Sequence, residues 1–177
     1  NAQEGFFDVE SVWPKLEQAL RQAISNLVAM RETEGSNIYG DFIKRADLIA
    51  EKLAVIEERS PQVVEEYQTR LSDRINELLE KHNQVIEPER LLQEVAIFAD
   101  RTSITEEIVR LKSHIKQFRL IIDADQPVGR KLDFLIQEFN REANTIASKA
   151  NDYTLAQVVV EIKAEIEKIR EQIQNIE

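Results

Sequence analysis

The segment LAQVVVEIKAEIEKIREQIQNI, residues 155–176, decides the fold class. Its apolar residues recur at alternating intervals of four and three, which is the heptad spacing of a helix that buries one stripe. This pattern predicts a helix over 154–175 that packs as a coiled coil. Its partner is another subunit or the chain's own preceding helix. The stripe consists of Leu155, Val159, Ile162, Ile166, Ile169, Ile173 and Ile176.

Helical periodicity continues through the rest of the chain. Ser60-Pro61 indicates a new helix, because Ser is a favoured N-cap and Pro is tolerated in the first helical turn. Ser103 and Glu106 have the spacing of a capping box, which predicts the start of another helix. Helices are therefore predicted over residues 11–59, 61–81, 88–101, 104–122, 129–150 and 154–175.

The predicted fold class is all-α, an elongated helical bundle. Residues 1–59 are expected to form a long N-terminal helical arm, because a helix of that length, rising about 1.5 Å per residue, outruns a compact core. Residues 60–177 form the predicted C-terminal helical domain, which ends in the coiled-coil-like helix.

Composition excludes several classes of protein. The chain has 177 residues and no cysteine, so disulfides, thiolate metal sites and a cysteine nucleophile are excluded. Four glycines and four prolines are too few for a β-sandwich or a Gly-rich phosphate loop. No apolar run is long enough to span a membrane and no secretory signal is evident, which predicts a cytoplasmic protein. A net charge of −10 should repel nucleic acid overall.

A pair of carboxylates borders the apolar face of the predicted helix over 129–150. Glu138 and Glu142 lie one helical turn apart, a spacing at which two carboxylates can share a hard cation such as Mg²⁺ or Mn²⁺. The alternative is an ordinary solvated helix surface, which is the commoner reason for such charged faces. The predicted apolar face consists of Leu132, Ile136, Phe139, Ala143, Ile146, Ala147 and Ala150.

The predicted helix over 104–122 places Glu107, Arg110 and His114 on one face, because they are three and four residues apart. A histidine in this position is either a metal ligand or general acid–base, or a structural or exposed side chain. Residue spacing alone indicates a helical bundle with a possible acidic cluster and leaves both interpretations open.

Longer motifs carry a resemblance to a known family. The segments EVAIFADR (94–101), GRKLDFLIQE (129–138) and NREANTIASK (140–149) resemble the YicC/YloC family of bacterial proteins, and MRETEG (30–35) resembles an earlier helix of that family. The resemblance extends over nearly the whole chain. One departure is Ala147, where the family usually has Gly.

The resemblance implies a function that periodicity does not. Members of this family are cytoplasmic endoribonucleases that depend on a divalent metal, Mn²⁺ or Mg²⁺, and assemble as homo-hexamers around a space for RNA. They carry an additional N-terminal α/β domain, so this chain is expected to be the C-terminal helical part of a longer protein. RNA is the expected partner, and neither DNA nor a membrane is expected.

Metal-assisted RNA cleavage requires carboxylates to hold the ion, a base, and cations for the developing charge. Glu138 and Glu142 are the predicted catalytic carboxylates, and His114 is the predicted base. The predicted metal ligands are Glu107, Asp133, Glu138 and Glu142. The predicted RNA-binding cations are Arg101, Arg110, Arg130, Arg141 and Lys149.

A second hypothesis is not enzymatic. In this alternative the chain is an oligomerisation and RNA-clamp module, and the chemistry resides on another domain. The polar face of helix 129–150 would then form salt bridges between helices or subunits.

Overall fold

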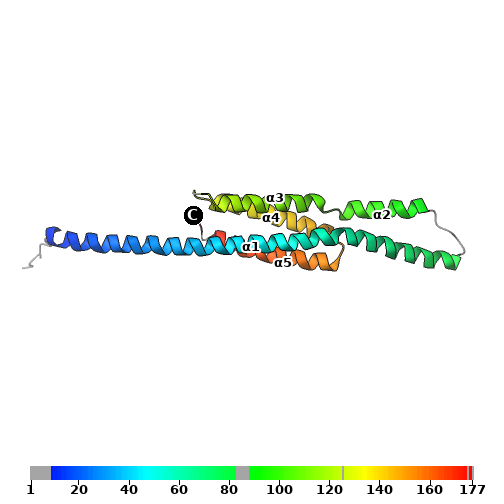
Figure 1. The fold of residues 1–177 in the computed structure, drawn as a ribbon, viewed down its shortest axis with the longest axis horizontal. Coiled ribbons are helices and arrows are strands. Elements are labelled where there is room, and N and C mark those ends of the chain that lie inside the picture. The colour runs from blue at the N-terminus through cyan, green and yellow to red at the C-terminus, as the bar shows by residue number, and fades with distance from the viewer. Residues whose placement is uncertain (1–8, 83–87, 125, 175, 177) are drawn as a thin grey trace, which may run out of the picture. The chain divides into compact units, whose positions relative to one another are not determined.

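The computed structural model describes residues 9–82, 88–124, 126–174 and 176. These residues form helices and no strand, which confirms the all-α fold class (Figure 1). No helix among them combines the length and the apolar character needed to cross a bilayer. The helices are α1 (Val9–His82), α2 (Pro88–Thr102), α3 (Thr105–Ile122), α4 (Gly129–Lys149) and α5 (Tyr153–Ile173).

The chain divides into two compact units, residues 1–41 and residues 42–177. Residues 42–59 were predicted to belong to the arm, but they contribute a buried heptad stripe to the second unit. That the remaining part of the arm projects from the protein stays a prediction. In the first unit, by contrast, α1 exposes its apolar stripe. The exposed side chains include Val12, Leu16, Leu20, Ile24, Leu27 and Val28.

Helix α1 continues through Pro61, so the helix boundary predicted there is wrong. A proline inside a helix removes one backbone hydrogen bond and costs about 3 kcal/mol. Contacts on both sides of the proline offset this cost. Arg59 donates hydrogen bonds to Glu66 (2.9 Å) and to Asp152, the N-cap residue of α5 (2.8 Å), and Val63 is buried. Tertiary contacts therefore override the local break signal.

The N-terminal ends of α3 and α5 are capped in different ways. The predicted capping box is not formed: Ser103 lies one residue too early, and the N-cap position is held by Ile104, without a side-chain hydrogen bond. Ile104 is buried instead, so packing rather than capping determines where α3 begins. Helix α5 begins after Asp152, whose Oδ1 accepts a hydrogen bond from the Leu155 amide (2.9 Å). Residue 175, the predicted end of the last helix, lies outside the described residues.

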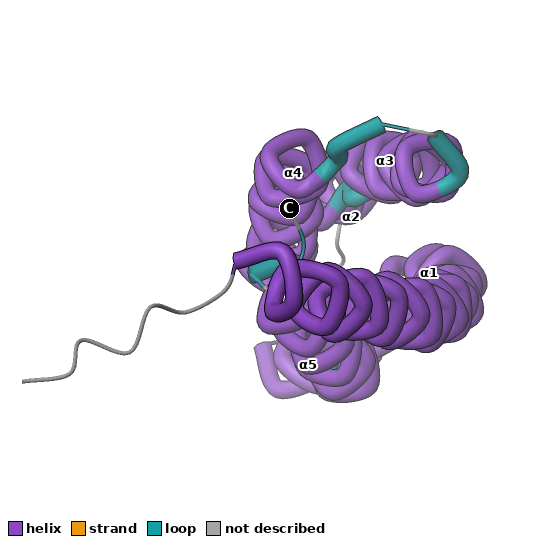
Figure 2. The backbone as a smooth tube through the Cα atoms, turned by 90° about the vertical axis from the view of Figure 1, so that its left-hand side faces the viewer, coloured by secondary structure: helices purple, strands orange, loops and turns teal. Residues whose placement is uncertain are grey.

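The second unit contains α2 and a bundle formed by α3, α4, α5 and the part of α1 that follows residue 41. Helix α4 packs against both α3 and α5 (Figures 1 and 2). Ion pairs join α1 to its neighbours: Arg45 to Glu165 on α5 (2.7 Å) and Asp47 to Arg119 on α3 (2.6 Å). The apolar stripe of α5 is buried from Leu155 to Ile173. This stripe therefore packs inside its own chain, which was one of the two predicted arrangements.

Candidate metal centre

Three side chains from α3 and α4 converge where the two helices pack together. His114 comes from α3, and Glu138 and Glu142 come from successive turns of α4. One ligand atom from each residue lies within 4.8 Å of the other two. His114 and Glu138 are half-buried, and Glu142 is buried. One imidazole and two carboxylates form a donor set that suits a divalent ion such as Mn²⁺ or Mg²⁺.

Glu142 lies at a position of the α4 heptad pattern where a buried apolar side chain is expected. Leu135, Phe139, Glu142 and Ile146 follow one another at intervals of four, three and four, and all are buried. Glu142 is only 3% exposed. A buried carboxylate is costly unless a cation compensates it. Arg110 Nη1 lies 3.8 Å from Glu142 Oε1, too far for a hydrogen bond, so this buried carboxylate is paired with Arg110 only at long range.

His114 has an unsatisfied nitrogen at the same point. Its Nδ1 atom is buried and has no hydrogen-bond partner among the described residues. The ring lies over Phe139, with ring centroids 6.3 Å apart and planes inclined by 26°. Buried polar atoms in folded proteins are nearly always paired. An unpaired imidazole nitrogen beside two carboxylates therefore fits a metal-ligand role.

Two of the predicted cations lie at the edge of this group. Arg110 forms ion pairs with Glu106 and, more distantly, with Glu142. Arg141 Nη1 lies 3.7 Å from Glu138 Oε2. Both arginine side chains remain at least half exposed, so they can also reach a phosphate group in solvent.

The structure places other predicted site residues outside the three-residue group. Glu107, a predicted metal ligand, accepts a hydrogen bond from Lys149, a predicted RNA-binding residue (2.7 Å), so the two side chains form an ion pair with each other. Asp133 is exposed and accepts a hydrogen bond from Gln137 (3.0 Å). Arg101 is exposed on α2. Neither Glu107 nor Asp133 belongs to the ligand group among the described residues.

The Glu107–Lys149 ion pair links α3 to the last turn of α4. Burial alone would raise the pKa of the Glu107 carboxyl, but the hydrogen bond and positive charge of Lys149, together with a backbone hydrogen bond and the charge of Arg110, outweigh burial and hold this pKa below its ordinary value. The ionised carboxylate is therefore favoured by folding.

We expect Glu107→Gln to lower the free energy of unfolding at neutral pH, and to matter less in acid. Because the folded pKa lies below the unfolded value of about 4.3, the ionised carboxylate stabilises the fold above that pH, and this contribution is lost as the pH falls through the folded pKa. Urea denaturation at pH values from neutral to strongly acidic measures the effect, with the exposed neighbour Glu106→Gln as control. A difference from wild type that is constant over the whole range would contradict the prediction.

A surface hollow of about 420 Å³ lies beside the three-residue group, between α3 and α4. Arg130, which was predicted as an RNA-binding residue, lines this hollow, whereas the hollow itself was not predicted. The heptad spacing along α4 is the sequence signal that could have improved the prediction. This spacing makes Leu135 a core residue, and it leaves Ala147 exposed, although Ala147 was predicted to be buried. Residues that line the hollow include His114, Gln117, Arg130, Lys131, Phe134 and Glu138.

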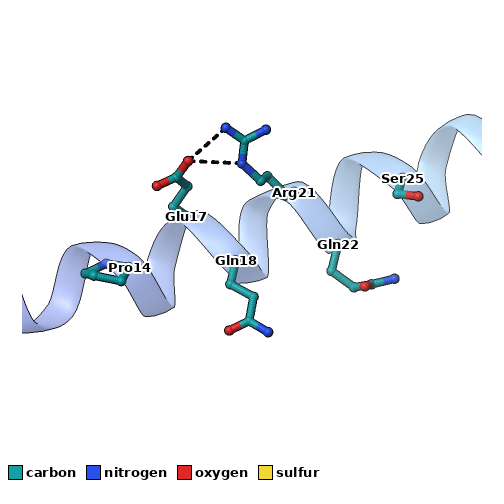
Figure 3. A pocket seen from close by; sticks show the side chains of 6 residues that line it. All are labelled: Pro14, Glu17, Gln18, Arg21, Gln22 and Ser25. Atoms are coloured by element: carbon teal, nitrogen blue, oxygen red, sulfur yellow. Dashed lines mark hydrogen bonds and ion pairs between the residues drawn. The ribbon is translucent and has the colours of Figure 1, made fainter.

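A second hollow lies on the first part of α1 and carries no site. Its lining residues, from Pro14 to Ser25, all belong to this one helix, and they include Arg21, which donates two hydrogen bonds to Glu17 (2.8 and 3.0 Å; Figure 3). Side chains from a single helix surface cannot enclose a ligand, so this hollow is ordinary helix surface.

Comparison with known proteins agrees with the sequence motifs. The family described as "Endoribonuclease YicC-like, C-terminal" matches residues 56–177. The chain is 51% identical over 170 residues to a "Probable endoribonuclease YicC" of Clostridioides difficile (strain 630), and 35% identical over 170 residues to a protein of the same description from Haemophilus influenzae. Each alignment covers 96% of this chain and 58% of the relative. The chain therefore belongs to the family of YicC-like endoribonucleases, and most of it matches their C-terminal domain.

Proposed function

We propose that the full-length protein is a cytoplasmic endoribonuclease that hydrolyses phosphodiester bonds in single-stranded or structured RNA. We further propose that His114, Glu138 and Glu142 hold the divalent cation, Mn²⁺ or Mg²⁺, on which cleavage depends. The proposal rests mainly on one observation, the convergence of an unpaired imidazole nitrogen with two carboxylates, one of them buried. The descriptions of the relatives supply RNA cleavage as the reaction.

Each side chain has a role that follows from its position. The chemistry that a divalent ion supplies at such a site is Lewis-acid stabilisation of phosphodiester charge. Glu142, buried in the α4 stripe, provides a fixed carboxylate, while half-buried Glu138 also faces the hollow. In this proposal Arg110 and Arg141, which lie at the edge of the site, bind the RNA phosphate and stabilise negative charge that develops on it. His114 is thus assigned to the ligand set rather than to the base.

A metal titration of the chain tests the ligand set directly. We expect Mn²⁺ to raise the melting temperature, because a ligand that binds only the folded state stabilises it, by about 2.7 kcal/mol at a hundredfold excess over its Kd. His114→Ala and Glu142→Gln should abolish the Mn²⁺-dependent part of the rise. Asp133→Asn is the matched control, because this exposed carboxylate lies on α4 outside the group. A wild-type melting temperature that does not respond to Mn²⁺ would overturn the proposed site.

The alternative function is a non-catalytic oligomerisation and RNA-clamp module. It is favoured by the exposed apolar stripe on the first part of α1, from Val12 to Val28, since extended apolar patches are typical of contact surfaces. A scaffold of this kind would show no Mn²⁺-dependent stabilisation. For either function we propose a homo-hexamer of the full-length protein, which a mass measurement in solution tests.

A further inference from the structure

We infer that the hollow between α3 and α4 is a nucleobase-binding subsite for single-stranded RNA, in which the Phe134 ring stacks on a base beside the metal centre. The inference rests on the proposed function, because it takes RNA as the ligand. The volume of about 420 Å³ falls within the range of about 300–1,000 Å³ that small-molecule sites occupy.

Phe134 is an aromatic residue of α4 that the core of the bundle does not use. It is 65% exposed, whereas Phe139, on the same helix, is completely buried. Phe134 precedes Glu138 by one helical turn, so the two side chains are neighbours on the wall of the hollow. An exposed flat ring offers a stacking surface that accepts any base, which is how proteins commonly hold single-stranded RNA.

Two cations stand at the same wall. Arg130 and Lys131 lie in the first turn of α4, and Arg130 precedes Phe134 by one turn. Neither cation forms an ion pair within the part of the chain that the structure describes. Both side chains are therefore available to an anionic ligand in the hollow. They are placed to bind the phosphate that adjoins the stacked base.

The opposite wall supplies a polar group and the link to the metal centre. Gln117 on α3 is exposed in the hollow, and its amide can both donate to and accept from a base edge. His114 and Glu138 belong to the hollow and to the candidate metal centre at once. A nucleotide whose base lies on Phe134 therefore has its backbone next to the group proposed to act in cleavage.

Binding of two RNA probes to the full-length protein tests the subsite. The probes are a fluorescein-labelled oligoadenylate and an abasic ribose-phosphate oligomer of equal length, both measured by anisotropy in EDTA so that no cleavage intervenes. We expect Phe134→Ala to weaken oligoadenylate binding about tenfold and to leave abasic binding unchanged, because only a base can stack. Phe134→Trp should restore affinity. Tyr153→Ala, which removes a 75% exposed aromatic residue from α5, is the matched control.

The possible outcomes separate this inference from the proposed function. Equal oligoadenylate affinity of wild type and Phe134→Ala would overturn the subsite while leaving the endoribonuclease proposal in place. Failure of wild type to bind either oligomer would overturn the subsite, and failure of wild type to cleave RNA in the presence of Mn²⁺ would overturn the endoribonuclease proposal. If Phe134→Ala changes the mass of the assembly without any base-dependent loss of affinity, the ring belongs to a subunit contact and the subsite is wrong.

Discussion

Replacing both Glu138 and Glu142 with Gln should slow metal-dependent RNA cleavage by the full-length protein at least about 100-fold, as expected for loss of a principal charge-stabilising element. Gln preserves the size and the hydrogen-bonding capacity of each side chain but removes the negative charge that a hard cation requires. The double variant should assemble as wild type does. It should also bind RNA as well or better, because two negative charges are removed from a site that approaches phosphate.

Asp133→Asn provides the control for this experiment, since it removes one carboxylate from the same helix without touching the three-residue group. We expect this variant to cleave RNA at the wild-type rate. Initial rates measured over a range of Mn²⁺ concentrations distinguish loss of metal binding from loss of RNA binding. If the Glu138→Gln/Glu142→Gln variant retains the wild-type rate and metal requirement, the carboxylate pair is ordinary helix surface and the proposed site is wrong.

Ile166→Asp or Ile169→Asp should destabilise the fold by about 4 kcal/mol or more. Both isoleucines are fully buried in the α5 stripe, so each substitution removes a large apolar contact and places a carboxylate in the core of the bundle without a partner. Since a domain of this kind is stable by only about 5–15 kcal/mol, the variants should have sharply lowered melting temperatures or fail to fold. Urea denaturation followed by circular dichroism measures the loss.

Val160→Asp is the matched control for the α5 variants. It introduces the same carboxylate into the same helix at a position that is 67% exposed. We expect it to change the free energy of unfolding by less than about 1 kcal/mol. An Ile166→Asp variant with the melting temperature of wild type would show that the stripe does not support the core.

The sequence by itself determined the fold class and most of the helix positions. The heptad stripe of α5 can be identified in the sequence because a buried helix face repeats with a local period, and its predicted positions from Leu155 to Ile173 are buried. The family was also evident from contiguous motifs, and the match to residues 56–177 confirms it. The proximity of Glu138 to Glu142 was equally predictable, since one helical turn separates them.

Tertiary structure alone decided which of the candidate residues meet. Local spacing could not show that His114 of α3 joins Glu138 and Glu142, or that Lys149 engages Glu107, because these pairings depend on how α3 packs on α4. The ligand set was predicted from the acidic residues alone. Only the packing of α3 on α4 shows which of these side chains lie close to one another.

The continuation of α1 through Pro61 has a similar cause. The sequence there carries a strong local signal for a new helix, and that signal reports only the hydrogen bonds of neighbouring residues. Arg59 and Val63 make contacts on either side of Pro61, including a hydrogen bond from Arg59 to Asp152, which is distant in sequence. Local periodicity thus determined where helices can form, and long-range packing decided where they end and which side chains they bring together.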